Sequence, residues 1–321
     1  MTYVFRRLVT QLIPVLFVAS ILIFASVRLI PGDPVAGAIG DAMGNTDPEV
    51  YEQLKEELGL NKPMYEQYWI WLGRIFAGDF GKSLTGLPVT EILGNAIPAS
   101  VELAGLAIII GFTLGLTLGV LAAVNRGGFF DWFAALWTGW NIGVPSFVAG
   151  LVYLIVFSVW FDLTPVSGRV PLTEDPIKAL EHLALPSLAL GGIVAANISR
   201  FTRQSLLDTM TEDYIRTARS KGLTNRAVIV RHALRPSLIP VVTIMGLELA
   251  SILSGTLVIE TVFTWPGLGR ALINAVNNRD YTVIQATTIL LVFVFVVVNL
   301  IVDLLYVSLD PRIRIGQSAE L

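Results

Sequence analysis

Few residues of this chain have the types and spacing that chemistry requires. The two histidines, His182 and His232, are far apart, and neither has a second ligand at metal-site spacing. The absence of cysteine excludes disulfides, thiolate metal sites and cysteine nucleophiles. No nucleophile elbow and no His-Glu-x-x-His pattern occurs. The sequence therefore predicts a protein that is not an enzyme and that holds no metal or cofactor of its own.

One stretch imitates a nucleotide-binding motif. Residues 76–83, "FAGDFGKS", end in the Gly-Lys-Ser of a phosphate-binding loop, but Phe76 stands where the pattern requires a glycine. The topology argued below also places this stretch outside the cell, where no ATP is available. We therefore reject a nucleotide site here.

The remaining candidates are polar residues within apolar runs, which are functional candidates by default in a membrane. Asn141, Asn197, Glu248, Asn299 and Asp303 are such residues. A carboxylate at Glu248 has the charge to meet an amine or another cation. The structural alternative is an interhelical hydrogen bond or a protonated carboxyl buried in the bundle. Two further carboxylates, Glu102 and Glu260, lie near the ends of apolar runs and are predicted to be structural ion-pair or capping residues.

The elements that must position these residues are membrane helices. Of the 321 residues, 54% are hydrophobic and only 15% are charged, well below the share in a soluble domain. A spanning helix needs about 20 mainly apolar residues. Six stretches qualify: residues 8–30, 99–124, 131–161, 183–206, 237–262 and 283–308. The fold class is therefore an all-α, polytopic membrane protein.

The distribution of Lys and Arg sets the orientation. Thirteen of these residues fall at the N-terminus, after the second span, between the fourth and fifth spans and in the tail, and eight fall on the opposite side over a greater length. With six spans, both termini and the basic loop between spans four and five are predicted to be cytoplasmic.

A long external segment, residues 31–98, follows the first span. It is acidic, with ten Asp and Glu against four basic residues. Asp47 and Pro48 suit a helix start and Gly59 its end. Aromatic residues then gather, and such residues favour the membrane boundary; they are Tyr65, Tyr68, Trp69, Trp71 and Phe76. We expect a small helical cap on the outer face.

The densest positive charge lies in "EDYIRTARSKGLTNRAVIVRHALRPSL", residues 212–238. Thr209 and Glu212 have capping-box spacing, so a helix is predicted over 213–221. Gly222 suits its left-handed stop. Thr224 suits the cap of a second helix that ends near Leu234, before Pro236.

Each half of this helix–turn–helix has a predicted apolar side. Tyr214 pairs with Ala218 in the first half, and Ala227, Val230 and Leu234 form a stripe in the second. Contact with anionic lipid explains the charge but not this design. The loop has neither the interleaved aromatic residues nor a recognised fold that would indicate nucleic-acid binding. Docking of a cytoplasmic partner explains both the charge and the two capped helices.

This loop resembles the "EAA" motif of permease subunits of binding-protein-dependent ABC importers, written E-A-A-x3-G-x9-I-x-L-P. Ala218, Gly222 and Leu234 match, Arg216 replaces the glutamate, and the proline is displaced to Pro236. The variant "DYIRTARSKGL" is similar to the peptide/nickel branch, and specifically to the subunit with a long external loop. Other stretches fit that branch, among them "RLIPGDPV" at 28–35, "LPSLALG" at 185–191 and "DLLYVSLDPRIR" at 303–314.

The resemblance implies the type I importer permease fold with four parts. They are residues 1–30 (N-terminus and first span), 31–98 (external), 99–308 (spans two to six, with a coupling loop at 207–236) and 309–321 (cytoplasmic tail). The implied function is translocation of di- or oligopeptides; nickel complexes and oligosaccharides are alternatives within the same machinery. A secondary transporter or channel is the rival class, but it calls for inverted repeats, and none is visible.

The implied partners are a homologous second permease, two cytoplasmic ATPases that bind ATP and Mg, an external solute-binding protein and the bilayer of a bacterial or archaeal cytoplasmic membrane. No nucleic acid is implied. ATPase coupling is assigned to one set of residues: Tyr214, Arg216, Thr217, Ala218, Arg219, Lys221, Gly222 and Leu234. The translocation path of peptides is assigned to Asn141, Asn197 and Glu248.

Overall fold

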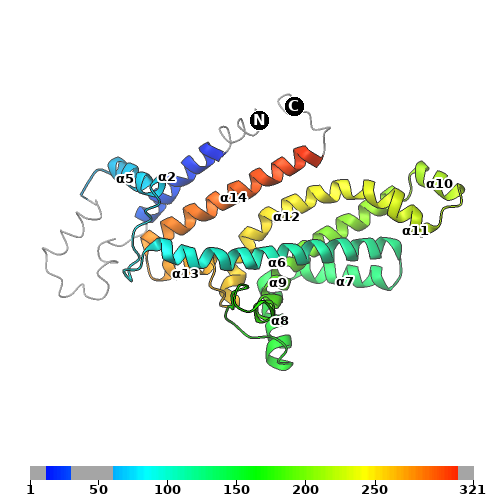
Figure 1. Cartoon of the computed structure of the whole chain (residues 1–321), viewed down its shortest axis with the longest axis horizontal. Coiled ribbons are helices and arrows are strands. Elements are labelled where there is room, and N and C mark those ends of the chain that lie inside the picture. The colour runs from blue at the N-terminus through cyan, green and yellow to red at the C-terminus, as the bar shows by residue number, and fades with distance from the viewer. Residues whose placement is uncertain (1–11, 30–60, 310–321) are drawn as a thin grey trace. The chain divides into compact units, whose positions relative to one another are not determined.

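The computed structural model describes residues 12–29 and 61–309, and within these ranges its regular elements are helices (Figure 1). A single isolated β-bridge joins Lys82 and Pro88 in the described part of the chain. The expected helix after Asp47 lies outside the described residues. The helices, two of them π-helices (η), are α2 Ile13–Leu29, α5 Met64–Phe76, α6 Val89–Val124, α7 Phe129–Gly143, α8 Ser146–Tyr153, η3 Leu154–Trp160, α9 Pro176–Thr209, α10 Asp213–Ser220, α11 Asn225–Ala227, η4 Val228–Ala233, α12 Leu234–Val262, α13 Leu268–Asn277 and α14 Tyr281–Leu309.

The helices agree with most of the predicted spans. Among the described residues, α6, α9, the run from α11 into α12, and α14 are each long and apolar enough to cross a membrane. The described part of the first predicted span is the shorter apolar helix α2. The third is not one straight span, because α7 and the run from α8 through η3 meet at 113°. Pro145 lies at this break and cannot donate a backbone hydrogen bond to α7, so the expectation of a single helix over 131–161 was wrong.

The chain forms two compact units. The first contains residues 1–98 and 266–297, and the second contains residues 99–265 and 298–321. The two are described separately below.

In the first unit, α5 packs on α2 through aromatic and polar contacts. Tyr68 Oη lies 2.8 Å from Ser20 Oγ, and the Tyr68 ring meets Phe24 edge-on. Arg28 donates to Gln67 and stacks on Phe24. The aromatic helix predicted from the sequence is thus a real element, fastened to the first apolar helix.

The rest of the first unit surrounds a buried aspartate. Asp280 accepts hydrogen bonds from Ser83 Oγ (2.6 Å) and from the backbone N–H groups of Leu84 and Val283, and it precedes the first turn of α14. The stretch that imitates a phosphate loop is therefore a structural turn held on a helix N-terminus. Apolar residues of α6, α13 and α14 pack beside it: Val89, Leu93, Ala96, Leu268, Ala275, Val283 and Ala286.

In the second unit, α9 is the central helix. Sixteen of its residues are buried. On one side it meets α6, where a Cβ built on Gly111 would lie 2.7 Å from Val194 Cγ1, and one on Gly115 would lie 2.7 Å from Ile198 Cβ. Only glycine permits this approach of the two backbones.

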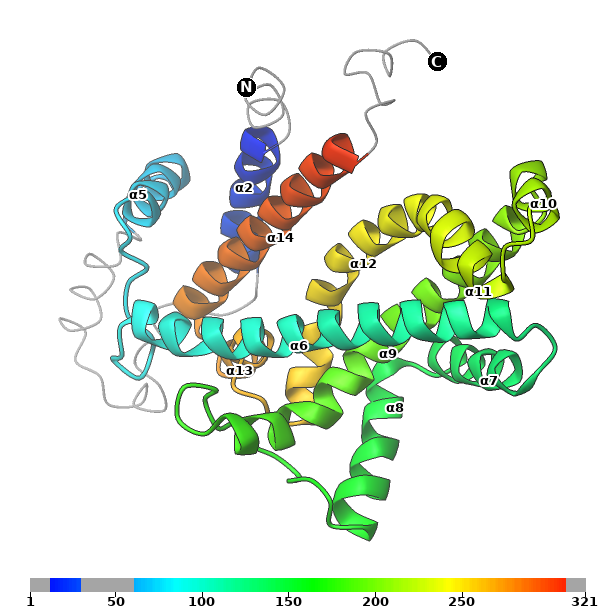
Figure 2. The same cartoon turned by 45° about the vertical axis from the view of Figure 1, so that its right-hand side comes forward.

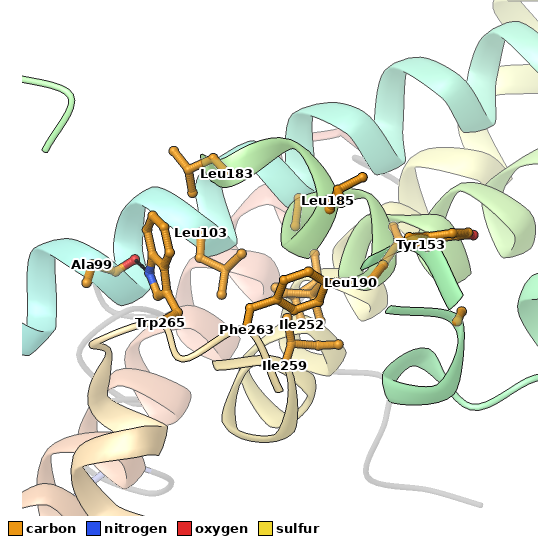
Figure 3. Close-up of a cluster of buried hydrophobic side chains, with 14 of the residues drawn as sticks. Ala99, Leu103, Tyr153, Leu183, Leu185, Leu190, Ile252, Ile259, Phe263 and Trp265 are labelled. Atoms are coloured by element: carbon orange, nitrogen blue, oxygen red, sulfur yellow. Dashed lines mark hydrogen bonds between the residues drawn. The ribbon is translucent and has the colours of Figure 1, made fainter. Parts of the chain in front are cut away.

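A hydrophobic core joins α6, α8, α9 and α12 within the same unit (Figure 3). Trp265 is fully buried, and its indole N–H donates to the carbonyl of Ala99 over 2.7 Å, as the close-up shows. Because a buried indole N–H is satisfied only by such an acceptor, this contact fixes the residue that follows α12 against α6.

Polar contacts hold the edges of the second unit. Glu102 forms a bidentate ion pair with Arg169, with both N–O distances at 2.7 Å, which confirms a structural ion-pair role for that carboxylate. Glu260 is fully buried and accepts from Ser100 Oγ over 2.6 Å, also a structural contact. Asp131 pairs with Arg203 at 2.6 Å and so ties the start of α7 to α9.

Candidate functional site

The predicted docking element lies at one end of the second unit, where α10 projects beyond the end of α9 (Figure 2). Thr209 is the last residue of α9, and its hydroxyl donates back to Ser205 O over 2.8 Å. Glu212 is the residue that precedes α10, and its side chain makes no capping hydrogen bond. The capping box predicted from Thr209 and Glu212 was therefore wrong, because the hydroxyl is already used by the preceding helix.

Gly222 ends the element as predicted. Its φ is +79°, in the left-handed region, and its N–H donates to Arg219 O over 2.9 Å. No heavy atom lies within 4 Å of a Cβ built at this position. The glycine is therefore required by its backbone conformation and not by crowding.

The inner face of α10 is made by Ile215 and Ala218, which are 0% and 6% exposed. They pack with Leu206 of α9 and with Val228 and Ala233 of η4. The predicted pairing of Tyr214 with Ala218 was wrong, because Tyr214 is 45% exposed while Ala218 faces inward. Ala218 therefore holds α10 on its own chain.

The outer face of α10 and its turn carries the polar side chains of the predicted set. Arg216 reaches Asp213 at 3.4 Å, but both side chains are open to solvent, at 74% and 95% exposure. A pair so exposed contributes little to stability, so Arg216 remains available to a partner. The exposed members of the predicted set are Tyr214, Arg216, Thr217, Arg219, Lys221 and Gly222.

The second half of the loop does not have the helical period of 3.6 residues that was predicted for it. Thr224 caps α11 by accepting from Ala227 N, as predicted. The chain then forms the π-helix η4, whose i→i+5 bonding changes which side chains share a face. Val230 is 57% exposed, while Val228 and Ala233, five residues apart, are buried. The predicted stripe of Ala227, Val230 and Leu234 was therefore wrong.

The helix also does not end near Leu234. Leu234 is partly buried and begins α12, which continues to Val262. Pro236 falls in the first turn of α12, where a missing N–H is tolerated. Residues 225–233, the second half of the predicted helix–turn–helix, thus lead directly into a long apolar helix.

The structure brings together two of the three predicted path residues. Asn197 of α9 donates its Nδ2 to Glu248 Oε1 of α12 over 2.9 Å. Ser251, one turn further along α12, lies 3.1 Å from Glu248 Oε2. This is the interhelical hydrogen bond that the sequence offered as an alternative. Sequence reasoning missed Ser251, although its i+3 spacing from Glu248 was a usable signal.

Asn141 lies elsewhere. It is 3% exposed, and its Nδ2 donates to Trp137 O on its own helix over 3.0 Å. A Cβ built on Gly192 of α9 would lie 2.3 Å from its Oδ1. Asn141 therefore occupies the packing between α7 and α9, apart from Asn197 and Glu248.

With this geometry in view, comparison with known proteins is informative. The model of the family described as "Binding-protein-dependent transport system inner membrane component" matches residues 115–315, and the model of the N-terminal part of such components matches residues 1–99. The chain belongs to this family. Members of the family are inner-membrane components of transport systems, in agreement with the apolar helices.

Relatives match over nearly the full length. A dipeptide transport system permease protein, DppB, of Escherichia coli is 42% identical and covers 97% of this chain and 98% of its own length. A di/tripeptide transport system permease protein, DppB, of Pseudomonas aeruginosa is 39% identical, and the match covers 98% of this chain and 99% of the relative. A glutathione transport system permease protein, GsiC, of Escherichia coli is also 39% identical (98% and 99%).

Solved structures share the permease fold. An inward-facing form of the MetNI methionine ABC transporter has a chain that matches with a TM-score of 0.54 at 17% identity, covering 68% of this chain and 96% of its own. A chain of an amino acid ABC transporter crystallised with histidines matches with a TM-score of 0.54 at 16% identity, and the match covers 68% of this chain and 94% of that chain. The fold is therefore that of the ABC importer permeases.

Proposed function

We propose that this chain is the permease subunit of an ATP-driven importer of short peptides. The observation that carries the proposal is its likeness, at 39–42% identity over nearly the whole length, to permeases named for dipeptides, di/tripeptides and glutathione, which is itself a tripeptide. Nickel complexes and oligosaccharides, which the sequence left open, have no counterpart among these relatives.

The proposed assembly contains this chain, a homologous permease, two cytoplasmic ATPases and an external solute-binding protein. In this proposal ATP and Mg are bound by the ATPases, and this chain carries out no covalent chemistry. It lies in a bacterial or archaeal cytoplasmic membrane with both termini inside. The excess of Lys and Arg in the loop that contains α10 supports that orientation.

Coupling to the ATPases is assigned to the outer face of α10. Tyr214 supplies an exposed aromatic ring, and Arg216, Arg219 and Lys221 supply cations that match acidic groups on a partner. Ala218 does not contact the partner in this proposal. It holds α10 in place by packing against the apolar residues on the buried side of that helix. Because Ile215 and Ala218 of α10 pack on Val228 and Ala233 of η4, and η4 runs directly into α12, a displacement of α10 is passed through these contacts into a membrane helix.

The transport path is assigned to Asn197 and Glu248, which meet between α9 and α12. Asn141, buried against α9, is proposed to act on the path only through helix packing.

The function is tested with the complete importer in proteoliposomes. We expect uptake of radiolabelled L-alanyl-L-alanine that requires the loaded binding protein and internal ATP, and that stops when the ATPase partner is made inactive by mutation. Uptake that continues with the inactive ATPase would identify a secondary transporter or channel. Absence of uptake for every di- and tripeptide tried would reject the substrate class.

The coupling assignment is tested at Gly222. Gly222→Val places a β-branched residue at a φ of +79°, so the turn distorts and uptake falls about tenfold or more, while binding-protein capture is retained. Gly222→Asn is the matched control, because asparagine tolerates left-handed backbone and the space around the Cβ is open. Normal uptake by the valine variant in proteoliposomes would contradict the assignment.

A further inference from the structure

One face of α12 is exposed along the middle of an otherwise apolar helix. Its members are three, four or seven residues apart, as on one side of a helix, and two of them, Thr243 and Ser251, are polar. Leu247 is 59% exposed and Val258 is 41% exposed. The exposed residues of this face, called the α12 face below, are Pro240, Thr243, Leu247, Ser251 and Val258.

Glu248 borders the α12 face and is itself partly exposed. Its carboxylate is oriented by two neutral groups: Asn197 Nδ2 lies 2.9 Å from Oε1, and Ser251 Oγ lies 3.1 Å from Oε2. Asn197 fixes Oε1, whereas the single proton of Ser251 is shared between Oε2 and the backbone carbonyl of Glu248, which lies 2.9 Å from Ser251 Oγ. Neither group supplies a positive charge. Compensation of a negative charge here must therefore come from a group outside this triad.

The chemistry of Glu248 disfavours contact with lipid. Ionisable side chains in membrane helices face a bundle interior or a water-filled cavity, because hydrocarbon cannot solvate them. The contact of the carboxylate with exposed Ser251 gives the α12 face a polar stretch at the level of Glu248. By contrast, Glu260 on the same helix is fully buried and bonded to Ser100, as a structural carboxylate is expected to be. The exposure of Glu248 thus distinguishes it from a residue that serves packing alone.

We propose that the α12 face lines the water-filled path and that Glu248 binds the positively charged amino group of the transported solute, with Asn197 and Ser251 as positioning residues. This inference rests on the proposed import of peptides, each of which carries such an amino group. The carboxylate offers charge-assisted hydrogen bonds, which are stronger than neutral ones. A single partly exposed contact of this kind orients a solute and still releases it, as passage through a membrane requires.

The ionised state and the access to water are tested together by cysteine labelling, since the chain has no cysteine of its own. Leu247→Cys places a thiol on the α12 face beside Glu248 and leaves the triad intact. In the assembled importer with otherwise cysteine-free subunits, the probes are a trimethylammonium and a sulfonate methanethiosulfonate of similar size. We expect the cationic reagent to be favoured, and Glu248→Gln to lower the ratio of the two rates about fivefold.

Val258→Cys is the matched control. It lies on the same face, ten residues or about 15 Å along the helix from Glu248, beyond the screening length of about 8 Å at physiological ionic strength. Its rate ratio is expected to be the same with and without Glu248→Gln. A ratio at position 247 that is equally insensitive to Glu248→Gln would overturn the proposal, as would a thiol at 247 that reacts with neither reagent.

Measurement of uptake is the second test of the proposal. Glu248→Gln keeps the size of the side chain and its capacity for hydrogen bonds, and we expect it to lower uptake of L-alanyl-L-alanine, relative to ATP hydrolysed, about fivefold or more. Glu248→Asp retains the charge and is expected to recover part of that loss. Glu91→Gln, the same change at an exposed carboxylate in the first turn of α6, is the control with unchanged uptake.

Uptake by Glu248→Gln within twofold of the unmodified importer would overturn the amino-group contact. Failure of the unmodified importer to move any short peptide would instead reject the proposed function. The labelling result at Leu247→Cys does not depend on the solute, so the two failures are distinguishable.

Discussion

The central helix α9 meets two neighbours in different ways. Toward α6 the contact is steric: Cβ atoms built on Gly111, Gly115 and Gly119 would lie 2.6 to 2.7 Å from side chains of α9, and 2.7 to 3.2 Å from its carbonyl oxygens. Toward α12 the contact includes a hydrogen-bonded pair, Asn197 with Glu248. At these three positions α6 has no side chain that can yield, whereas the contact of α9 with α12 includes polar groups that can exchange partners.

This difference predicts which helices move together. Close-packed surfaces resist gradual sliding, because any shift forces hard atoms together. We therefore expect α6 and α9 to move as one body during transport. The α9–α12 seam has a tight point at Gly255, but the atom it meets is Cδ1 of Leu190, the end of a flexible side chain. The N-terminal end of α12 directly follows the loop that is proposed to contact the ATPase. The contact between α9 and α12 is therefore the one nearest to the place where movement is proposed to enter.

The largest expected effect comes from breaking the steric seam. Gly115→Leu adds four carbons where a single Cβ would already lie 2.7 Å from Ile198 and 3.0 Å from Ala195 O. We expect it to destabilise the fold by about 3 kcal/mol or more, seen as loss of the monodisperse peak in detergent size-exclusion chromatography. Gly105→Ala, on the same helix with nothing within 4 Å of its Cβ, is the control with an unchanged peak. An equal loss in both variants would show that the seam is not steric.

A middle-sized effect is expected at the ion pair that adds a polar contact to α6. Glu102→Gln leaves the guanidinium of Arg169 without its charge partner, and both side chains are only about one-seventh exposed, at 14% and 15%. We expect a loss of about 2 kcal/mol in thermal unfolding of the detergent-solubilised complex, because breaking a largely buried pair strands one charge. Adding Arg169→Gln should recover part of the loss. A double variant as unstable as the sum of the singles would mean that the two residues act independently.

The smallest effect is expected at the polar seam. Asn197→Ala and Glu248→Ala, alone and together, form a double-mutant cycle in thermal unfolding, with an expected coupling energy of about 0.6 kcal/mol. Such a value, far below the cost of Gly115→Leu, would establish that the α9–α12 seam yields easily. A coupling above about 2 kcal/mol would make it a rigid joint and remove the contrast between the two seams.

Much of the helical plan was predictable, and the exceptions have local causes. Apolar runs long enough to span a membrane gave α6, α9, α12 and α14, because length and hydrophobicity are properties of the chain alone. The bend after α7 had a visible signal in Pro145, but a proline indicates a break without stating its angle.

The two helices around Gly222 were predicted in outline, but the sides of these helices that are buried were not. Gly222 and Thr224 were identified correctly, since left-handed stops and caps are read from one or two residues. The buried faces were not, because η4 replaces the 3.6-residue period with i→i+5 bonding and turns Val228 and Ala233 inward. Ala218 is small enough to suit either a partner's groove or its own core, and its type alone does not choose between them.

By itself, the sequence determined that the chain is a helical membrane protein and where one glycine turn must lie. These follow from solvation of apolar runs and from backbone sterics, which act locally. The tertiary structure alone decided that Ala218 faces its own chain, that Asn141 packs apart from the other path residues, and that Asn197 meets Glu248 across 51 positions of sequence. Those outcomes depend on the rotation of each helix against its neighbours, which local rules leave free and only packing fixes.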